Sequence, residues 1–461
     1  MRSDNVLIVG GGLSGLSTAY YLARYGIRST IIEKAGRLGG LIKTDHLDGC
    51  WLEAGPDSYL AAKTAVADLA AELGGLPDKV ISSNDAARRV FVVRGGRLLP
   101  MPRGMSMMVP GDLPAAFGSA LLGTSTKIRL LRETWMKPRA RPEDFSVGEL
   151  VSDHFGPEML EYVAEPLLCG VYGGDAEQLS ANSVLPRFTA YEKRFGSLIK
   201  GVRNDQKKPA ETTGSLFRSF EGGMQTLTDA LVKATAKSVP IIYSEVTRID
   251  KADAGWRVQV GQESMSCSRV VLACPAHVSA ALLDRSAPEM ATELLGIPYS
   301  SAILAMLLFD RATLGHSLDG FGFLIPRNER ETIAAATWVN TKFPSRIRPG
   351  LAAMRGFIVG GKAEELMRAG ADKDVVTKLV LADFQRLMGF SADPLFSTVY
   401  FWPKCMPQYV VGHQTRVKSL LRLEDKSAGL HLASNIMEGV GVPDTIRRAK
   451  DVAKQIAGDR V

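Results

Sequence analysis

The pattern of apolar and polar positions near the amino terminus predicts a strand, a tight turn and a helix in direct succession. Residues 6–9 (Val-Leu-Ile-Val) form a continuously apolar run of strand length, and a glycine-rich stretch, residues 10–15, follows at once. Apolar side chains then recur at helical spacing over residues 16–25, and a second apolar run, residues 29–32, ends at Glu33. This order is typical of a β-α-β unit, so we predict an α/β fold with a parallel sheet.

The glycine-rich stretch has the G-x-G-x-x-G spacing of a dinucleotide-binding turn. Gly10 permits the tight turn, Gly12 lets the backbone approach a pyrophosphate, and Gly15 lets the helix pack close to the strand. The phosphates would lie at the helix N-terminus, where unpaired N–H groups favour negative charge. Glu33 is placed to accept hydrogen bonds from ribose hydroxyls, which favours FAD or NAD over a 2′-phosphorylated cofactor.

Two later stretches predict that distant parts of the chain complete the same domain. Residues 220–224 precede a helical pattern and a short strand pattern, while residues 429–444 predict a strand, a glycine-rich turn and the start of a helix. The second stretch alone fits an ordinary strand-to-helix turn equally well. We expect a discontinuous Rossmann-type dinucleotide-binding domain of residues 1–100, 216–286 and 413–461, a mostly helical lobe of residues 101–215, and a mixed α+β substrate-binding domain of residues 287–412.

Composition and charge limit the classes of function. With 46% hydrophobic and 23% charged residues the chain is typical of a globular protein, and no apolar run reaches the roughly 18 residues of a membrane span. The 56 basic residues exceed the 49 acidic ones, giving a net charge of +7, which suggests an anionic ligand or an acidic membrane surface. Nucleic acid ranks last, because the basic residues are scattered and no nucleic-acid-binding motif occurs.

Cysteine and histidine usage indicates neither disulfides nor a metal site. The five cysteines form no C-x-x-C pair, and the six histidines lack the spacing of metal ligands. The amino terminus enters the first strand pattern directly, leaving no room for a signal peptide. We therefore expect a cytoplasmic protein with reduced thiols and no bound metal.

The residues after Glu33 distinguish the dinucleotide. Residues 33–40 (Glu-Lys-Ala-Gly-Arg-Leu-Gly-Gly) and 52–56 (Leu-Glu-Ala-Gly-Pro) resemble the E-x-x-x-x-R-x-G-G and E-x-G-P elements of a flavoprotein superfamily that includes amine oxidases, phytoene desaturases and porphyrinogen oxidases. NAD dehydrogenases lack these elements. The resemblance implies FAD, with the diphosphate and isoalloxazine beside Arg37, Gly39 and Gly40.

Four further segments resemble the porphyrinogen oxidases of haem biosynthesis, so that the similarity covers essentially the whole chain. They are residues 165–180, 192–197, 320–326 and 402–409. The family oxidises a porphyrinogen to a porphyrin, removing six electrons in three flavin cycles, with oxygen as acceptor and hydrogen peroxide as product. The protein supplies orientation, an apolar slot and anion binding for propionates, so we expect no catalytic acid or base.

The resemblance also implies individual contacts. It implies cofactor contacts at Gly10, Gly11, Gly12, Leu13, Ser14, Gly15, Glu33, Lys34, Arg37, Gly39, Gly40, Leu41, Gly55, Pro56, Asp57, Ser58, Val246, Trp402, Val440, Gly441 and Val442. For the tetrapyrrole, Arg89 is the candidate propionate partner, and a solvated strand arginine is the alternative that we favour less. Gly170 would leave space beside the ring, and Leu324 and Ile358 would form apolar walls.

Alternatives remain for the substrate and the class of enzyme. Residues 336–344 and 438–444 resemble the coproporphyrinogen-oxidising bacterial branch, which slightly favours coproporphyrinogen III over protoporphyrinogen IX. Extra carboxylates could meet Lys342, Arg346 and Arg348, unless these line a charged surface loop. An amine oxidase would usually carry a flavin-linking cysteine near the last motif, where Ser434 stands, so we expect non-covalent FAD. A flavin-binding protein without turnover also fits, and the sequence does not predict the oligomeric state.

Residues 110–141 combine an apolar stretch with a basic edge and an interfacial aromatic, Trp135. This combination predicts peripheral membrane contact. The alternative, which we favour from the sequence, is an amphipathic helix packed on its own lobe with a solvated basic face.

Overall fold

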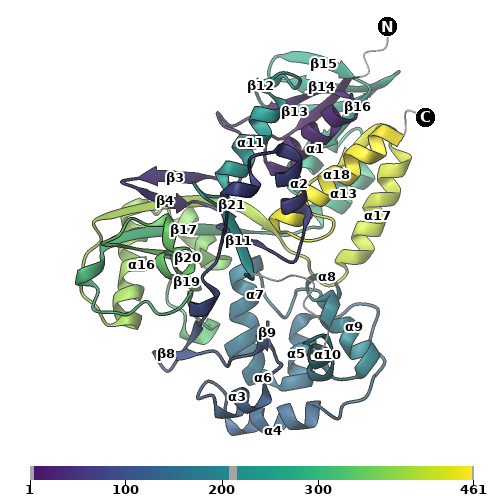
Figure 1. Ribbon diagram of the computed structural model, residues 1–461. Coiled ribbons are helices and arrows are strands. Elements are labelled where there is room, and N and C mark those ends of the chain that lie inside the picture. The colour runs from purple at the N-terminus through teal and green to yellow at the C-terminus, as the bar shows by residue number, and fades with distance from the viewer. Residues whose placement is uncertain (1–4, 207–214, 459–461) are drawn as a thin grey trace.

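The structure, a computed structural model, describes residues 5–206 and 215–458. Figure 1 shows three parts: a parallel sheet with its helices near the two termini, a second sheet beside it, and a helical lobe at the opposite end. None of the helices in the described ranges is long and apolar enough to cross a membrane.

The parallel sheet draws its five strands from separate parts of the chain, in the order β12-β2-β1-β16-β22. Its strands are β1 (Asn5–Val9), β2 (Arg28–Glu33), β12 (Ile241–Tyr243), β16 (Arg269–Leu272) and β22 (Leu430–Leu432). Because Leu7 and Ile8 are both fully buried and point to opposite faces, the sheet must be covered on both sides. The predicted α/β fold with a discontinuous Rossmann-type domain is confirmed.

Two sets of elements provide this cover. One face packs against the helices α1 (Leu13–Arg24), α2 (Ala65–Leu73), α11 (Gln225–Thr235) and α18 (Val442–Gly458). The other packs against an antiparallel sheet, β13 (Val246–Ala252), β14 (Gly255–Val260) and β15 (Glu263–Cys267), and against α12 (Ala276–Leu283), α13 (Pro288–Leu295) and α17 (His413–Lys426). Residues of β1 alternate between the two cores, Ile8 facing the first and Leu7 the second.

The second sheet has seven strands in the order β21-β17-β20-β19-β18-β7-β8. They are β7 (Val90–Arg94), β8 (Arg97–Pro100), β17 (Tyr299–Asp310), β18 (Gly322–Leu324), β19 (Ala335–Trp338), β20 (Leu351–Val359) and β21 (Phe396–Pro407). One face packs against α15 (Gly361–Arg368) and α16 (Lys373–Met388), whose Val380 and Phe384 are fully buried. The other face lies toward the dinucleotide-binding domain and the helical lobe.

Two expected domain boundaries differ from the structure. Residues 90–100, expected in the dinucleotide-binding domain, form β7 and β8 of the seven-stranded sheet, where β7 pairs in parallel with β18. Conversely α13, expected in the substrate-binding domain, packs against the core of the parallel sheet through Met290 and Leu294. The first difference arises from long-range strand pairing and the second from helix packing on a distant core, and a local pattern specifies neither.

The helical lobe forms around its own core. Its helices are α3 (Leu113–Gly118), α4 (Thr124–Glu133), α5 (Val147–Phe155), α6 (Pro157–Met159), a π-helical turn (Leu160–Ala164), α7 (Glu165–Tyr172), α8 (Ala181–Val184), α9 (Pro186–Phe195) and α10 (Leu198–Gln206). A buried His154 lies between two carboxylates, with Nδ1 2.9 Å from Glu133 and Nε2 3.0 Å from Glu192. Ser146 begins α5 with a reciprocal capping box to Glu149.

Short strands and one short helix connect the three parts. They are β3 (Thr44–Leu47), β4 (Cys50–Glu53), β5 (Tyr59–Leu60), β6 (Val80–Ser82), β9 (Met105–Ser106), β10 (Val109–Pro110), β11 (Phe217–Phe220) and α14 (Val339–Lys342). The β3–β4 hairpin leads into the segment of residues 53–58, which reaches the inner face of the seven-stranded sheet.

Candidate cofactor and substrate site

The glycines of the first turn meet different constraints. Gly10 has φ +107°, and a Cβ there would lie 2.9 Å from the Ala273 carbonyl oxygen. A Cβ at Gly15 would lie 1.9 Å from the Gly10 carbonyl oxygen, so the start of α1 packs directly on the turn. At Gly12, φ is −72° and an added Cβ would only touch the Gly40 Cα, at 3.6 Å. The fold therefore requires Gly10 and Gly15 but leaves room at Gly12.

Two helix N-termini face the same edge of the parallel sheet. Gly12 precedes α1, and no side chain of the described residues caps the first N–H groups of this helix. Those of Leu13, Ser14 and Gly15 therefore remain available to an anion. Helix α18 begins at Val442 after β22, directly following Val440 and Gly441, and packs against α1. Since β1 and β22 belong to one parallel sheet, both helices start at the carboxyl edge of its strands.

Glu33 ends β2 beside the turn. Its Oε2 accepts a hydrogen bond from the Gly11 N–H at 2.6 Å, and its Oε1 accepts from the Ala35 N–H at 2.7 Å. These bonds fix the carboxylate next to the turn, and each oxygen keeps a lone pair for a hydroxyl. Lys34 is exposed, 3.7 Å from Glu245, and Val246 starts the neighbouring strand β13.

The second glycine pair adjoins the first turn. The Gly39 N–H donates to the Gly11 carbonyl at 2.9 Å. Arg37 holds the backbone around this pair, because its guanidinium donates to the carbonyls of Leu38 (3.1 Å), Ile42 (3.2 Å) and Gly40. Arg37 therefore shapes the backbone at Gly39 and Gly40. Leu41 follows, and its side chain is exposed.

The segment of residues 53–58 is held against the seven-stranded sheet. A Cβ at Gly55 would lie 1.9 Å from the Leu41 carbonyl oxygen, so this segment packs on the second glycine pair. Trp402 donates its indole N–H to the Ala54 carbonyl at 2.7 Å, and Arg355 donates to the Gly55 carbonyl at 2.6 Å. Pro56 continues the chain to Asp57 and Ser58, whose side chains both contact the Lys342 ammonium.

Three basic residues that were expected to contact the substrate form ion pairs with carboxylates of the protein. The Lys342 ammonium lies 2.9 Å from both carboxylate oxygens of Asp57, and Arg346 pairs with Glu53 at 2.9 Å. Arg348 pairs with Asp48 at 2.8 Å on the surface. Lys342 and Arg346 are nearly buried in these pairs, and Arg348 lies 3.7 Å from the Cβ position of Gly49, in the turn between β3 and β4. The suggestion that these three cations meet substrate carboxylates is therefore not supported.

Opposing effects set the protonation of this cluster. Burial alone would raise the pKa of the Asp57 carboxyl, but Lys342 and Arg355 outweigh it and hold that pKa well below its ordinary value. Burial raises the pKa of Glu53 despite the neighbouring Arg346. Burial also lowers the pKa of Lys342, although Asp57 opposes the change.

A row of apolar side chains crosses the inner face of the seven-stranded sheet. Leu324, Ala335, Phe357, Leu304 and Tyr400 are paired in register from β18 to β21. Helix α7 lies over one end of this row, since a Cβ at Gly170 would be 3.8 Å from Leu324. The structure thus brings Gly170 and Leu324 together, as expected.

Ile358 does not belong to this row. Its side chain is fully buried on the opposite face of the sheet, among the residues that pack against α15 and α16. The expectation that it forms an apolar wall of the slot is wrong, because adjacent residues of a strand point to opposite faces. Phe357, one residue earlier, occupies the inner face and lies beside Arg355, whose guanidinium is 4.9 Å from the ring centroid.

Arg89 lies just before β7, and its carbonyl accepts from the Phe321 N–H at 2.7 Å. Its side chain is 54% exposed and pairs with Asp319. It is therefore accessible to a ligand, at the end of β18 away from Leu324. Arg355 was not among the predicted site residues, although an arginine inside the apolar run of residues 351–359 is a signal of buried pairing.

The family model for flavin containing amine oxidoreductases matches residues 13–457. The chain belongs to this family. It is 30% identical to the coproporphyrinogen III oxidase of Bacillus subtilis (strain 168), over 97% of this chain and 96% of that protein. It is also 30% identical to the enzyme of that name from Staphylococcus aureus, over 99% and 100% of the two chains. Its resemblance to porphyrinogen oxidases is confirmed.

Solved structures agree with this assignment. A protein from Exiguobacterium sp. 255-15, named provisionally as a protoporphyrinogen oxidase, superposes with a TM-score of 0.88 at 28% identity, covering 100% of both chains. UDP-galactopyranose mutase shares the fold, with a TM-score of 0.72 at 14% identity over 99% of this chain and 94% of that one. This flavin-containing oxidoreductase therefore has FAD as its cofactor.

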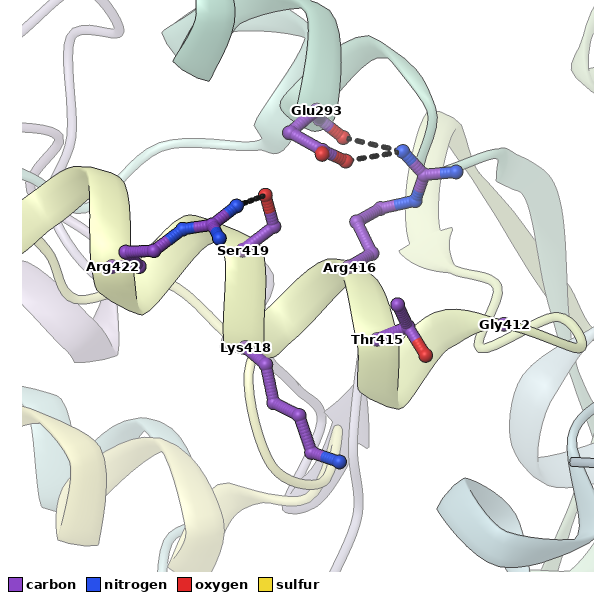
Figure 2. Close-up of a pocket in the computed structure, with 7 residues that line it drawn as sticks. All are labelled: Glu293, Gly412, Thr415, Arg416, Lys418, Ser419 and Arg422. Carbon is purple, nitrogen blue, oxygen red and sulfur yellow. Dashed lines mark hydrogen bonds and ion pairs between the residues drawn. The ribbon is translucent and has the colours of Figure 1, made fainter. Parts of the chain in front are cut away.

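The described residues fit FAD along its length. Glu33 would take the ribose, and the uncapped start of α1 would take the pyrophosphate. A pocket elsewhere, between α13 and α17, contains none of these residues (Figure 2). Its lining includes Lys418 and Arg422, while Arg416 is held by Glu293 at 2.9 Å.

Proposed function

We propose that this flavoprotein oxidises coproporphyrinogen III to coproporphyrin III, binding FAD non-covalently and using oxygen as electron acceptor. The observation that carries the proposal is the similarity to two bacterial coproporphyrinogen III oxidases over nearly the whole of both chains. Bound FAD supplies the hydride acceptor. Removal of six electrons and six protons in three turnovers reduces three oxygen molecules to three hydrogen peroxide molecules.

In this proposal the side chains bind and orient the macrocycle. The apolar row of Leu324, Ala335 and Phe357 offers a flat wall, and Gly170 keeps α7 clear of it. Arg89, exposed at one end of β18, offers a bidentate donor to a propionate. No acid or base is needed, because aromatisation draws the imine tautomers forward.

Protoporphyrinogen IX is the alternative substrate. The chain is 26% identical to protoporphyrinogen oxidase 2 of Arabidopsis thaliana, over 97% of this chain and 92% of that protein. Each propionate moved from water into an apolar cleft needs a cationic or N–H partner. Since Lys342 and Arg346 are held in nearly buried pairs and Arg348 lies at the turn between β3 and β4, the preference for coproporphyrinogen III is supported by the bacterial relatives and not by these cations.

A parallel assay tests the proposal. The purified protein should be yellow, should generate a fluorescent porphyrin from either porphyrinogen in air, and should show the higher kcat/KM with coproporphyrinogen III. Hydrogen peroxide should form at three molecules per porphyrin. A preference for protoporphyrinogen IX would select the alternative substrate, and oxidation of amines without porphyrinogen turnover would select an amine oxidase. A yellow protein that oxidises neither would be a flavin-binding protein without this activity.

We expect Arg89→Gln to raise KM with little change in kcat, because a propionate keeps its charge throughout the oxidation. Steady-state kinetics with coproporphyrinogen III measure this. Arg348→Gln is the matched control, since it also removes an exposed, ion-paired arginine. A fall in kcat at unchanged KM for Arg89→Gln would contradict a role in substrate binding.

Peripheral membrane contact is also proposed. Helix α4 buries Thr126, Leu130 and Glu133 in the lobe, while its outer side exposes Ile128 and Leu131, followed by Trp135 at 73% exposure. The spacing of three residues places Ile128 and Leu131 on one face of α4, and Trp135 follows in the turn after the helix. These observations support both the packed helix and an outward apolar stripe of Ile128, Leu131 and Trp135. Helix α4 lies at the end of the lobe farthest from the parallel sheet (Figure 1).

A further inference from the structure

Five charged side chains meet where the dinucleotide-binding domain contacts the seven-stranded sheet. Glu53 and Asp57 come from the first part, and Lys342, Arg346 and Arg355 from the second. Glu53, Arg346 and Arg355 are at most 2% exposed, and the side chains of Lys342 and Asp57 are 12% and 14% exposed. We call these five residues the interdomain cluster.

The interdomain cluster contains one more cation than anions. Asp57 accepts from Lys342 at 2.9 Å and pairs with Arg355 at 3.0 Å, while Glu53 pairs with Arg346 at 2.9 Å. Among the described residues, the ion pairs of these three cations go only to Glu53 and Asp57. The Nε atoms of Arg346 and Arg355 are buried without a hydrogen-bond partner in the described part of the chain. An excess buried charge is costly, so a negative group nearby would be stabilised.

The contacts already described place the interdomain cluster at one end of the cofactor route. Glu33 marks the ribose end and Gly12 the pyrophosphate. Glu33 contacts Gly11, next to Gly12, and on the other side of Gly12 the backbone contacts Gly40, after which Leu41 contacts Gly55. Arg355 donates to the Gly55 carbonyl. The cluster therefore lies toward the redox-active end of the dinucleotide.

We propose that the excess positive charge of the interdomain cluster stabilises the reduced cofactor and raises its reduction potential. Two electrons and one proton that arrive as hydride leave one negative charge on the isoalloxazine ring. Lys342 and Arg355 offset this charge through a medium that screens less than water, while Asp57 moderates their effect. This role concerns the cofactor alone and extends beyond the choice of substrate.

Opposite charge changes at one ion pair separate this role from a structural one. Lys342→Met removes the excess cation, and Asp57→Asn adds to it. Sulfite is a suitable probe, because it adds to the oxidised ring by an N–S bond at N5 and leaves one negative charge on the ring. We expect Lys342→Met to weaken sulfite binding about tenfold and Asp57→Asn to strengthen it about tenfold, the scale of one buried unit charge. At about 30 mV per tenfold for a two-electron couple, the midpoint potential should fall and rise correspondingly.

The double variant Lys342→Met/Asp57→Asn should return both values toward the wild type, since it restores the original net charge. Arg348→Met, which removes a cation from an exposed pair, should change neither. All proteins are measured loaded with FAD and without porphyrinogen, so failure of the proposed activity does not affect the result. If Lys342→Met does not fold, the proposal is tested by the other two proteins. Asp57→Asn should still strengthen sulfite binding, and the double variant should still return it toward the wild-type value. Shifts of the same sign in the single variants, or no shift, would overturn the proposal.

Discussion

The glycines of the G-x-G-x-x-G turn are required for different physical reasons. Gly15 is required by the protein alone, because its Cβ position lies 1.9 Å from a backbone oxygen. Gly12 has ordinary backbone angles and room for a methyl group. A requirement for glycine at position 12 can therefore come only from the ligand.

Gly12→Ala should leave the thermal midpoint of the protein stripped of FAD nearly unchanged, but should weaken FAD binding about 10- to 100-fold, since a methyl group would push the pyrophosphate away. Gly15→Ala should instead destabilise the protein itself by more than about 3 kcal/mol. Thermal unfolding and FAD titration of both variants measure these effects. Full flavin binding by Gly12→Ala would show that the phosphates do not approach this residue.

A buried histidine should make stability depend on pH. His413 is 3% exposed and stacks on Tyr409 with ring centroids 4.0 Å apart. Burial, reinforced by Arg416, lowers its pKa to about 4. Between pH 6.5 and 4 the unfolded chain therefore binds a proton that the folded chain does not, so stability falls as pH falls. The full difference is about 3 kcal/mol, reached near pH 4.

Replacing this ring by one that does not titrate should flatten the pH dependence. His413→Phe should lose less stability than the wild type between pH 6.5 and 4, even if its stability at pH 7 is lower. Urea unfolding at several pH values gives both slopes, and the comparison cancels the titration of other groups. Equal slopes would mean that His413 titrates alike in the folded and unfolded chains.

At the scale of elements, local patterns predicted what local sequence determines. The apolar runs of residues 6–9 and 29–32 correspond to β1 and β2, and the helical pattern after Gly15 lies in α1. Pairing between distant strands was not predictable, so residues 90–100 were expected in the dinucleotide-binding domain although they form β7 and β8 of the seven-stranded sheet. The choice between Phe357 and Ile358 depends on a one-residue register, and both are apolar.

The same limit explains the interdomain cluster. Lys342 and Arg346 follow a strand and resemble charged loop residues in the sequence, but their partners Asp57 and Glu53 are nearly 300 positions away. Only the packing of β20 and α14 on the segment of residues 53–58 shows that they are held inside. The glycine turn and Glu33 were identified because they lie at fixed spacing within one β-α-β unit, and the E-x-G-P element was identified by its resemblance to the flavoprotein superfamily.

Helix α7 offers a test of the substrate slot. Gly170 lies in this helix with open space around its Cβ position, where only Leu324 comes within 4 Å among the described residues. Gly170→Leu should keep or raise stability, because leucine favours helix more than glycine by up to about 1 kcal/mol. It should nevertheless lower kcat/KM for coproporphyrinogen III by on the order of 10²-fold, because the side chain displaces the macrocycle.

The matched control is Gly361→Leu in α15, another helical glycine whose Cβ position meets no described residue within 4 Å. It should preserve both stability and turnover. Flavin content, the thermal midpoint and steady-state kinetics separate the effects. Unchanged turnover in Gly170→Leu would place the macrocycle away from α7.

At the scale of the whole molecule, the net charge is +7, but some of the basic residues are already held in ion pairs with carboxylates. Arg139 and Arg141, within the predicted membrane segment, are occupied by Glu192 and Asp153. The remaining basic residues of this segment are Lys127, Arg129, Arg132 and Lys137. Membrane attraction would therefore come from fewer charges than the sequence suggests, together with the exposed stripe.

We expect the protein to pellet with anionic vesicles at low salt and to be released as salt rises. Each basic residue near an anionic surface contributes about 1 kcal/mol, and the Debye length is only about 10 Å at 0.1 M salt. Neutral vesicles should bind weakly, because the three apolar side chains would then bind the membrane without electrostatic attraction of the basic residues. Changing Ile128, Leu131 and Trp135 together to serine should abolish pelleting, whereas Leu395→Ser, at a 65% exposed leucine far along the chain, should not. If the wild type pellets under no condition, α4 is only a helix packed on its own lobe.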